Sequence, residues 1–324
     1  MTIFNWFSYT QSLKLLLDKI TLIMSINTDR DVLEACAKTL EFLCTDGSAI
    51  YTQCDVARSN IIDESVNRYK EAIDDWRNLI AGEEIPDEDE IHNVRINLKK
   101  VAILYSCHNL NPWSLFGSLY QDIEEYIGDS MNDKSIPSEA LVYCIESCFF
   151  SISWGLSSLE NSFESSALAS TAEELRRNLD KYMEACNNLI KFAVKPQIKE
   201  AAYLSLCDLL VICSAHLSKN SNKYVKMIEA RPTDAQKDLL IDFVKTYVFS
   251  SRQEDAQDET KIEELHKKRN YLAAYSKLVV YNILPTSAAC DIFKYYIKVC
   301  VNVLQLISSV VLIIYVFYSK TVLQ

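Results

Sequence analysis

Residues 61–86 read IIDESVNRYKEAIDDWRNLIAGEEIP, and the expected fold class follows from this stretch. Its large apolar residues recur in steps of four and three, at Ile62, Val66, Tyr69, Ile73, Trp76 and Ile80. That spacing places one apolar stripe along one face of an α-helix. The segment from Gly82 to Pro86 then breaks the helix, because glycine and proline both disfavour helical backbone. The stretch therefore predicts a long amphipathic helix that ends near Ile80.

The same spacing recurs on both sides of this stretch, for example in residues 91–105 and 175–193, and no segment shows sustained period-two alternation. Polar loops separate the helical stretches, often at a proline: Pro86, Pro112, Pro137, Pro196, Pro232 and Pro285. We expect Asn111-Pro112 to begin one of these helices. The pattern predicts an all-α chain of about twelve helices, arranged as a serial array of antiparallel helix pairs. A compact bundle of the same helices stays open, because no repeat of fixed period is visible.

The composition excludes several other classes of protein. Only 5 glycines and 6 prolines occur in 324 residues, too few for the frequent tight turns of a β-sandwich or barrel. No glycine-rich phosphate loop can be assembled from them. The net charge of −11 argues against broad nucleic-acid binding, which needs clustered lysine and arginine.

The 11 cysteines and 4 histidines give no sign of a metal or catalytic site. No CxxC pair occurs, and no histidine lies at zinc-ligand spacing from a cysteine pair. Most cysteines lie in apolar helical stretches, which indicates buried, reduced thiols. The sequence therefore predicts neither an enzyme nor a bound cofactor or metal.

Five collinear segments resemble the SA (stromal antigen, stromalin) family of cohesin subunits. They are DVLEACAKTLEFLCTDGSAIYTQCDVARSNIIDE (31–64), GEEIPDEDEIHNV (82–94), NLNPWSLFGSLY (109–120), KEAAYLSLCDLLVICS (199–214) and KIEELHKKRNYLAAYSKLVVYNILPTSAACDIFKYYIK (261–298). The resemblance implies a HEAT-like helical repeat array, an α-solenoid, over residues 1–298. It also implies a non-enzymatic scaffold that binds the kleisin subunit of cohesin, other ring and regulatory proteins, and chromatin. The expected location is the nucleus, on chromosomes, with a role in sister-chromatid cohesion.

The sequence also departs from the family pattern. The stromalin conservative domain that normally precedes the matched part is absent, as is the C-terminal half of the repeat array. After residue 298 the resemblance stops abruptly. We therefore expect the chain to be a fragment, an isoform or an imperfect gene product.

Residues 299–324 form a separate apolar tail outside the family pattern. The segment 299–318, VCVNVLQLISSVVLIIYVFY, contains no charged residue and is long enough as a helix to cross a bilayer core. Three interpretations stay open: a transmembrane anchor, a buried terminal helix, and translated non-coding or alternative sequence. The first would make the chain a membrane-anchored helical interaction protein.

Two groups of residues are candidates for partner binding. Asp291, Lys294 and Tyr295 lie three and four positions apart and share one helix face, which we expect to contribute to the kleisin groove. An ion pair within the helix, or a helix cap, is the alternative. The cluster of Lys267, Lys268 and Arg269 predicts either a solvated helix face or a contact with phosphate or an acidic partner.

The acidic runs 87–90 and 254–259 are best interpreted as solvated surface charge, since they lack the ligand spacing of a calcium loop. The alternative is that they attract basic segments of partner proteins.

Overall fold

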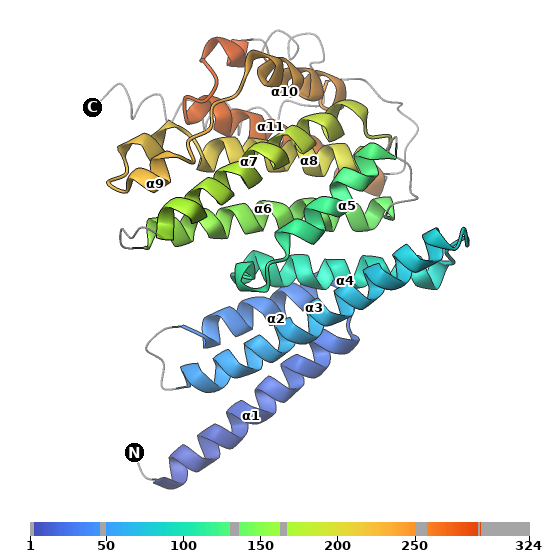
Figure 1. The fold of residues 1–324 in the computed structure, drawn as a ribbon, viewed down its shortest axis with the longest axis vertical. Coiled ribbons are helices and arrows are strands. Elements are labelled where there is room, and N and C mark those ends of the chain that lie inside the picture. The colour runs from blue at the N-terminus through green and yellow to red at the C-terminus, as the bar shows by residue number, and fades with distance from the viewer. Residues whose placement is uncertain are drawn as a thin grey trace. The chain divides into compact units, whose positions relative to one another are not determined.

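The computed structural model describes residues 3–45, 50–129, 136–162, 167–249, 258–290 and 292. Eleven numbered α-helices and two short 3-10 helices lie in these ranges, which contain no strand (Figure 1). Residues 287–290 and 292 are helical as well. The predicted all-α class is confirmed. The chain divides into two compact units, Met1–Trp154 and Gly155–Gln324.

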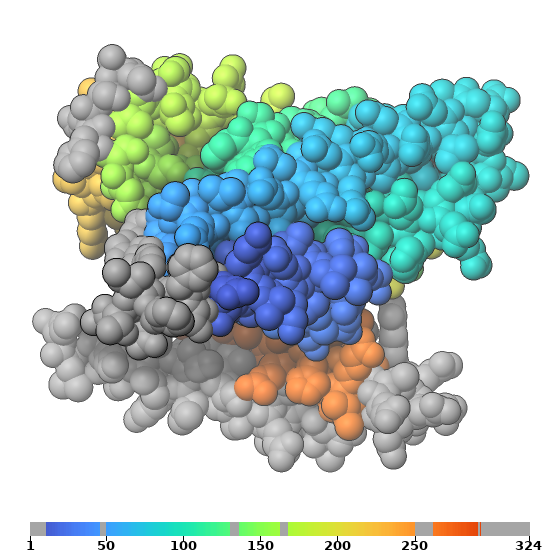
Figure 2. Space-filling view, turned by 90° about the horizontal axis from the view of Figure 1, so that it is seen from below, coloured from blue at the N-terminus to red at the C-terminus, as the bar shows by residue number. Residues whose placement is uncertain are grey.

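The first unit is built around a long pair of antiparallel helices. Its elements are α1 (Ile3–Ile26), α2 (Arg30–Leu43), α3 (Tyr51–Ala81), α4 (Glu88–Cys107), η1 (Asn111–Trp113), α5 (Phe116–Gly128) and most of α6 (Ser138–Glu160). Helix α3 packs along α4, and α4 also packs against α2. Helices α1, α2 and α3 lie side by side, in dark to light blue in Figure 2.

The second unit continues the pattern of paired helices. Its elements are α7 (Ala167–Phe192), α8 (Pro196–Ile212), η2 (Ala215–Lys219), α9 (Lys223–Lys226), α10 (Asp234–Tyr247) and α11 (Asp258–Val280). Helix α8 packs against both α7 and α11, and α10 contacts α7 and α11. Tyr203 of α8 stacks on Phe243 of α10 with ring centroids 4.0 Å apart, so an aromatic contact joins two of these helices.

Local sequence explains where α3 ends and α4 begins. Gly82 caps the end of α3, and Glu83 follows with a φ of 57°, in the left-handed region. The Glu84 amide then donates to the carbonyl of Leu79 at 3.1 Å. Helix α4 begins with a capping box, in which Asp87 and Glu90 each accept a hydrogen bond from the other's backbone amide at 2.8 Å. The predicted break at Gly82–Pro86 is therefore confirmed.

The prediction that a regular helix begins at Asn111-Pro112 is wrong. These residues form only the 3-10 turn η1, which ends at Trp113 and is followed by Ser114 as its C-cap. Ser114 has a φ of 53°, a left-handed conformation that no helix can continue through. The regular helix α5 starts at Phe116 instead.

The predicted apolar stripes are the core of each unit. Val66, Tyr69, Ile73 and Trp76 of α3 are all buried, as are Leu98 and Val101 on the facing helix α4. Nine of the ten cysteines in the described ranges are buried free thiols, and Cys290 is exposed. Burial raises the pKa of the Cys186 thiol to about 12, so this cysteine stays protonated and unreactive at neutral pH.

One buried histidine links the end of α4 to α2 through a hydrogen bond. The His108 ring is only 4% exposed, and its Nε2–H donates to the carbonyl oxygen of Ala37 at 3.1 Å. A carbonyl can only accept, so the neutral ring needs its proton on Nε2. Burial and, to a smaller extent, the positive charge of Arg58 lower the pKa of His108 to about 4.

This shift predicts acid destabilisation that depends on His108. Between pH 6.5 and about 4 the unfolded chain binds a proton at His108 that the folded chain does not, so stability falls as the pH falls through this window. His108→Gln removes that loss. The difference in the free energy of unfolding, wild type minus His108→Gln, is expected to fall by roughly 2–3 kcal/mol from pH 7 to pH 4. Urea unfolding at several pH values measures it, and parallel pH profiles of the two proteins would contradict it.

Candidate interaction surface

Several of the predicted functional residues lie outside the described residues. These are Asp291, Lys294 and Tyr295, together with the apolar segment 299–318. The kleisin-groove assignment and the membrane-anchor interpretation therefore stay predictions.

The structure places the basic cluster on helix α11. Lys267 Nζ lies 3.3 Å from Glu263 Oε1, and Lys268 Nζ lies 2.9 Å from Glu264 Oε1, each one helical turn away. Arg269 is exposed beside them. Surface pairs of this kind contribute only about 0.3–0.5 kcal/mol each, so they leave the lysines free to exchange partners. The phosphate contact stays a prediction, which an unchanged DNA affinity after charge reversal at all three positions would exclude.

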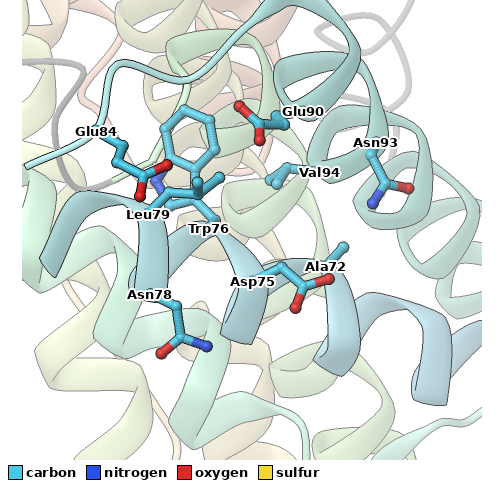
Figure 3. A pocket seen from close by; sticks show the side chains of 9 residues that line it. All are labelled: Ala72, Asp75, Trp76, Asn78, Leu79, Glu84, Glu90, Asn93 and Val94. Carbon is cyan, nitrogen blue, oxygen red and sulfur yellow. The ribbon is translucent and has the colours of Figure 1, made fainter. Parts of the chain in front are cut away.

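The first unit carries a hollow that the sequence did not single out. It has a volume of about 410 Å³ and lies where α3 ends and α4 begins. Figure 3 shows the side chains that line it: Ala72, Asp75, Trp76, Asn78, Leu79, Glu84, Glu90, Asn93 and Val94. In that view the Trp76 ring lies between the carboxylates of Glu84 and Glu90. The hollow thus combines apolar walls with three carboxylates.

A second hollow of about 510 Å³ lies beside the first. Both are lined by Ala72, Asp75 and Asn93, so together they form one groove along α3 and α4, here called the α3–α4 groove. The second hollow is also lined by Ser25, Ile26, Thr28, Arg68, Glu71, Ile96, Asn97 and Lys100. The groove therefore extends from the end of α1 to the loop between α3 and α4.

Both basic side chains in the groove already have partners. Lys100 Nζ donates to the carbonyl oxygen of Ser25 at 2.7 Å, which caps the end of α1. Burial, and next the charge of Arg68, lower the pKa of Lys100. Arg68 itself pairs with Glu64 at 2.6 Å. By contrast, no lysine or arginine lines the first hollow, and no ion pair to Asp75 or Glu84 is found among the described residues, so the negative charge of the groove is concentrated there.

A buried ion pair fixes α3 against α5 next to the groove. Asp122 of α5 has a side chain only 2% exposed, and its Oδ1 accepts a hydrogen bond from Arg77 Nη2 at 2.7 Å. The Tyr69 hydroxyl lies 3.5 Å from the other carboxylate oxygen. Burial raises the pKa of Asp122 to about 6, although the positive charge of Arg77 opposes this shift. Because Arg77 follows Trp76 directly, the pair fixes the orientation of α3 at the groove.

The acidic run at residues 87–90 is visible in the sequence, but the groove is not. The acidic run does not form the hollow by itself. The hollow is also lined by Asp75 and Trp76 of α3, which lie beside Glu84 and Glu90. The helical spacing of Trp76 indicated core packing, and its 4% exposure agrees with that. One feature of the sequence does point to the groove. The short break at Gly82–Pro86 turns α4 back along α3, which brings residues of the two helices together.

Two described helices are long and apolar enough to cross a membrane by length and composition alone. They are Ser138–Glu160 and Pro196–Lys219, and in each about half of the apolar window is buried inside the protein. Core helices of globular proteins commonly show both properties. This observation therefore gives weak support to a membrane location.

Comparison with known proteins points to one family. The family model described as "Cohesin subunit SCC3/SA, HEAT-repeats domain" matches residues 1–154. Among curated relatives, Cohesin subunit SA-1 of Xenopus laevis is 32% identical over 293 residues, or 87% of this chain. Cohesin subunit SA-3 of Homo sapiens is 26% identical over 88% of the chain, and Cohesin subunit scc-3 of Caenorhabditis elegans is 25% identical over 61%.

The matches cover only part of each relative. They correspond to 22% of SA-1, 23% of human SA-3 and 17% of scc-3, so the chain spans about a fifth of the length of these relatives. The matched HEAT-repeats domain confirms the helical-repeat class predicted from the sequence, and its range coincides with the first compact unit.

Proposed function

Because the chain belongs to the SCC3/SA family of cohesin subunits, we propose that it acts as a non-enzymatic scaffold of cohesin that binds the kleisin subunit. The observation that supports this most is the similarity to SA-1, which extends over 87% of the chain and thus into both compact units. Paired helices such as α3–α4 and α7–α8 expose long, rigid faces, which suit a protein that holds other proteins.

The proposed partners and location follow from the same membership. The kleisin subunit comes first, followed by other ring and regulatory proteins, with chromatin reached through them or through the basic cluster on α11. The proposed location is the nucleus, on chromosomes. The described residues contain no group of three or more His, Cys, Asp and Glu side chains that could hold a metal ion. The similarity to cohesin subunits favours scaffolding rather than catalysis as the role that we propose.

Co-purification of the full chain with the kleisin subunit of the same species tests this function. We expect specific retention, and we expect Asp291→Lys to abolish it, because a reversed charge on the proposed kleisin face replaces attraction with repulsion. Asp238→Lys is the matched control, since it makes the same charge change at an exposed position on α10. Absence of kleisin binding by the wild type, with a helical circular dichroism spectrum, would overturn the proposal. Equal retention of both variants would remove Asp291 from the kleisin face.

A membrane-anchored interaction protein is the second candidate function, and the uncharged run at residues 299–318 favours it. Under this alternative the chain sediments with membranes after cell fractionation and needs detergent for extraction. Recovery in a salt-extracted nuclear fraction without detergent would exclude it.

A further inference from the structure

We propose that the α3–α4 groove is a docking site for a basic segment of another protein, one that carries lysine or arginine together with a large aliphatic residue. This interaction would be additional to kleisin binding and does not depend on it. The shape of the groove, the negative charge of its first hollow and the exposed isoleucines Ile26 and Ile85 all favour such a segment.

The charge of the groove selects a cationic occupant. Asp75, Glu84 and Glu90 line the first hollow, which no lysine or arginine of the described ranges lines. Glu71 and Asp75 line the second together with Arg68 and Lys100, so the excess of negative charge lies in the first hollow. Glu90 uses one carboxylate oxygen to accept the Asp87 amide in the capping box and keeps further acceptor capacity. Ammonium and guanidinium groups form the strongest hydrogen bonds with such carboxylates. Phosphate-bearing ligands are disfavoured by the same charge, which argues for a protein segment rather than a nucleic acid.

The apolar part of the groove selects a segment with aliphatic character. Ile85, in the loop between α3 and α4, is 94% exposed and follows Glu84, which lines the first hollow. Ile26 is 70% exposed and lines the second hollow at the other end. Between them lie Ala72, Leu79 and Val94, on which the hydrocarbon stem of a lysine or arginine can pack. An occupant that covers both isoleucines removes apolar surface from water.

The dimensions fit side chains of a peptide rather than a bare ion. The two hollows, of about 410 and 510 Å³, are each within the range of roughly 300–1,000 Å³ that is typical of binding pockets. They share Asp75, so a segment that follows the groove passes this carboxylate on its way from Ile26 to Glu84. The loop conformation is held by the capping box, so the rim exists before anything binds.

Fluorescence anisotropy with the full chain tests the site. The probe is a short fluorescein-labelled peptide rich in lysine, arginine and leucine. One counterpart has glutamine at each basic position, and another has serine at each leucine. We expect the wild type to bind the first peptide and to bind both counterparts more weakly. Absence of binding to the first peptide, or equal binding of either counterpart, would overturn the proposal.

A matched pair of double variants separates this groove from general attraction by an acidic protein. Asp75→Asn with Glu84→Gln removes two charges that line the groove. Asp74→Asn with Glu83→Gln removes two exposed charges at the adjacent positions, neither of which lines it. We expect roughly fivefold or greater weakening for the first pair and less than about twofold for the second. An equal loss of peptide affinity in both double variants would show that binding depends only on net charge, and it would overturn the proposal. Circular dichroism checks that both variants keep the helical fold.

Discussion

Replacing Tyr203 with alanine is expected to lower the stability of the second unit by about 4 kcal/mol, the cost typical of deleting a buried aromatic ring. Tyr203 is fully buried in α8. Its ring stacks on Phe243 at an interplanar angle of 9° and meets Tyr271 edge to face, with centroids 6.1 Å apart. Its hydroxyl donates to the carbonyl oxygen of Tyr271 at 3.0 Å. The substitution therefore leaves a cavity among three helices and removes the donor for a buried carbonyl.

Tyr203→Phe is the control for this prediction. It keeps the ring and its stacking and loses only the hydrogen bond, so we expect a loss of about 1 kcal/mol. Because the chain has two compact units, hydrogen exchange should be followed on peptides from α8 and α11 rather than on the whole chain. A similar loss of protection in both variants would show that packing around Tyr203 contributes little.

Replacing Asp122 with alanine is expected to destabilise the first unit by about 3 kcal/mol. Removing one partner of a buried ion pair leaves the other charge uncompensated, which typically costs 3–5 kcal/mol. The value should fall at the low end of this range, because the Arg77 side chain is 36% exposed and can turn toward water. Urea unfolding, followed by hydrogen exchange of α3 and α5, measures the loss.

Asp122→Asn separates charge from shape in the same experiment. The amide oxygen can still accept the hydrogen bond from Arg77, and the neutral group avoids the desolvation that raises the pKa of Asp122. We therefore expect Asp122→Asn to cost no more than about 1 kcal/mol at neutral pH. A loss as large as that of Asp122→Ala would show that the negative charge itself is required.

Helix existence was predictable because it depends on local spacing. The steps of four and three from Ile62 to Ile80 place their side chains on one face whatever else the chain does, and α3 follows that prediction. The start of α4 could also be predicted from local sequence. Asp87 and Glu90 are three residues apart, the spacing at which two side chains form a capping box at a helix N-terminus. The 3-10 turn at Asn111–Trp113 was not, because Ser114 carries no residue-type signal for its left-handed conformation.

The candidate site was much harder to predict from the sequence than the helices. The acidic run at 87–90 was visible in the sequence, but it becomes part of a groove only through contact with residues of α3. Nothing near Asp122 in the sequence shows that Arg77 and Tyr69 lie against it in the folded protein.

The sequence by itself determined the helical class, the main breaks between helices and the family, because periodicity, glycine and proline content and collinear similarity are properties of residue order. Only the tertiary structure decided which charges are buried, which are paired and which face a concave surface. Asp75 and Asp74 are neighbours in the chain and chemically identical, yet only Asp75 lines the groove. The physical reason is that a helix turns by about 100° per residue, so the packing of α3 against α4 decides which of two adjacent side chains lines the groove.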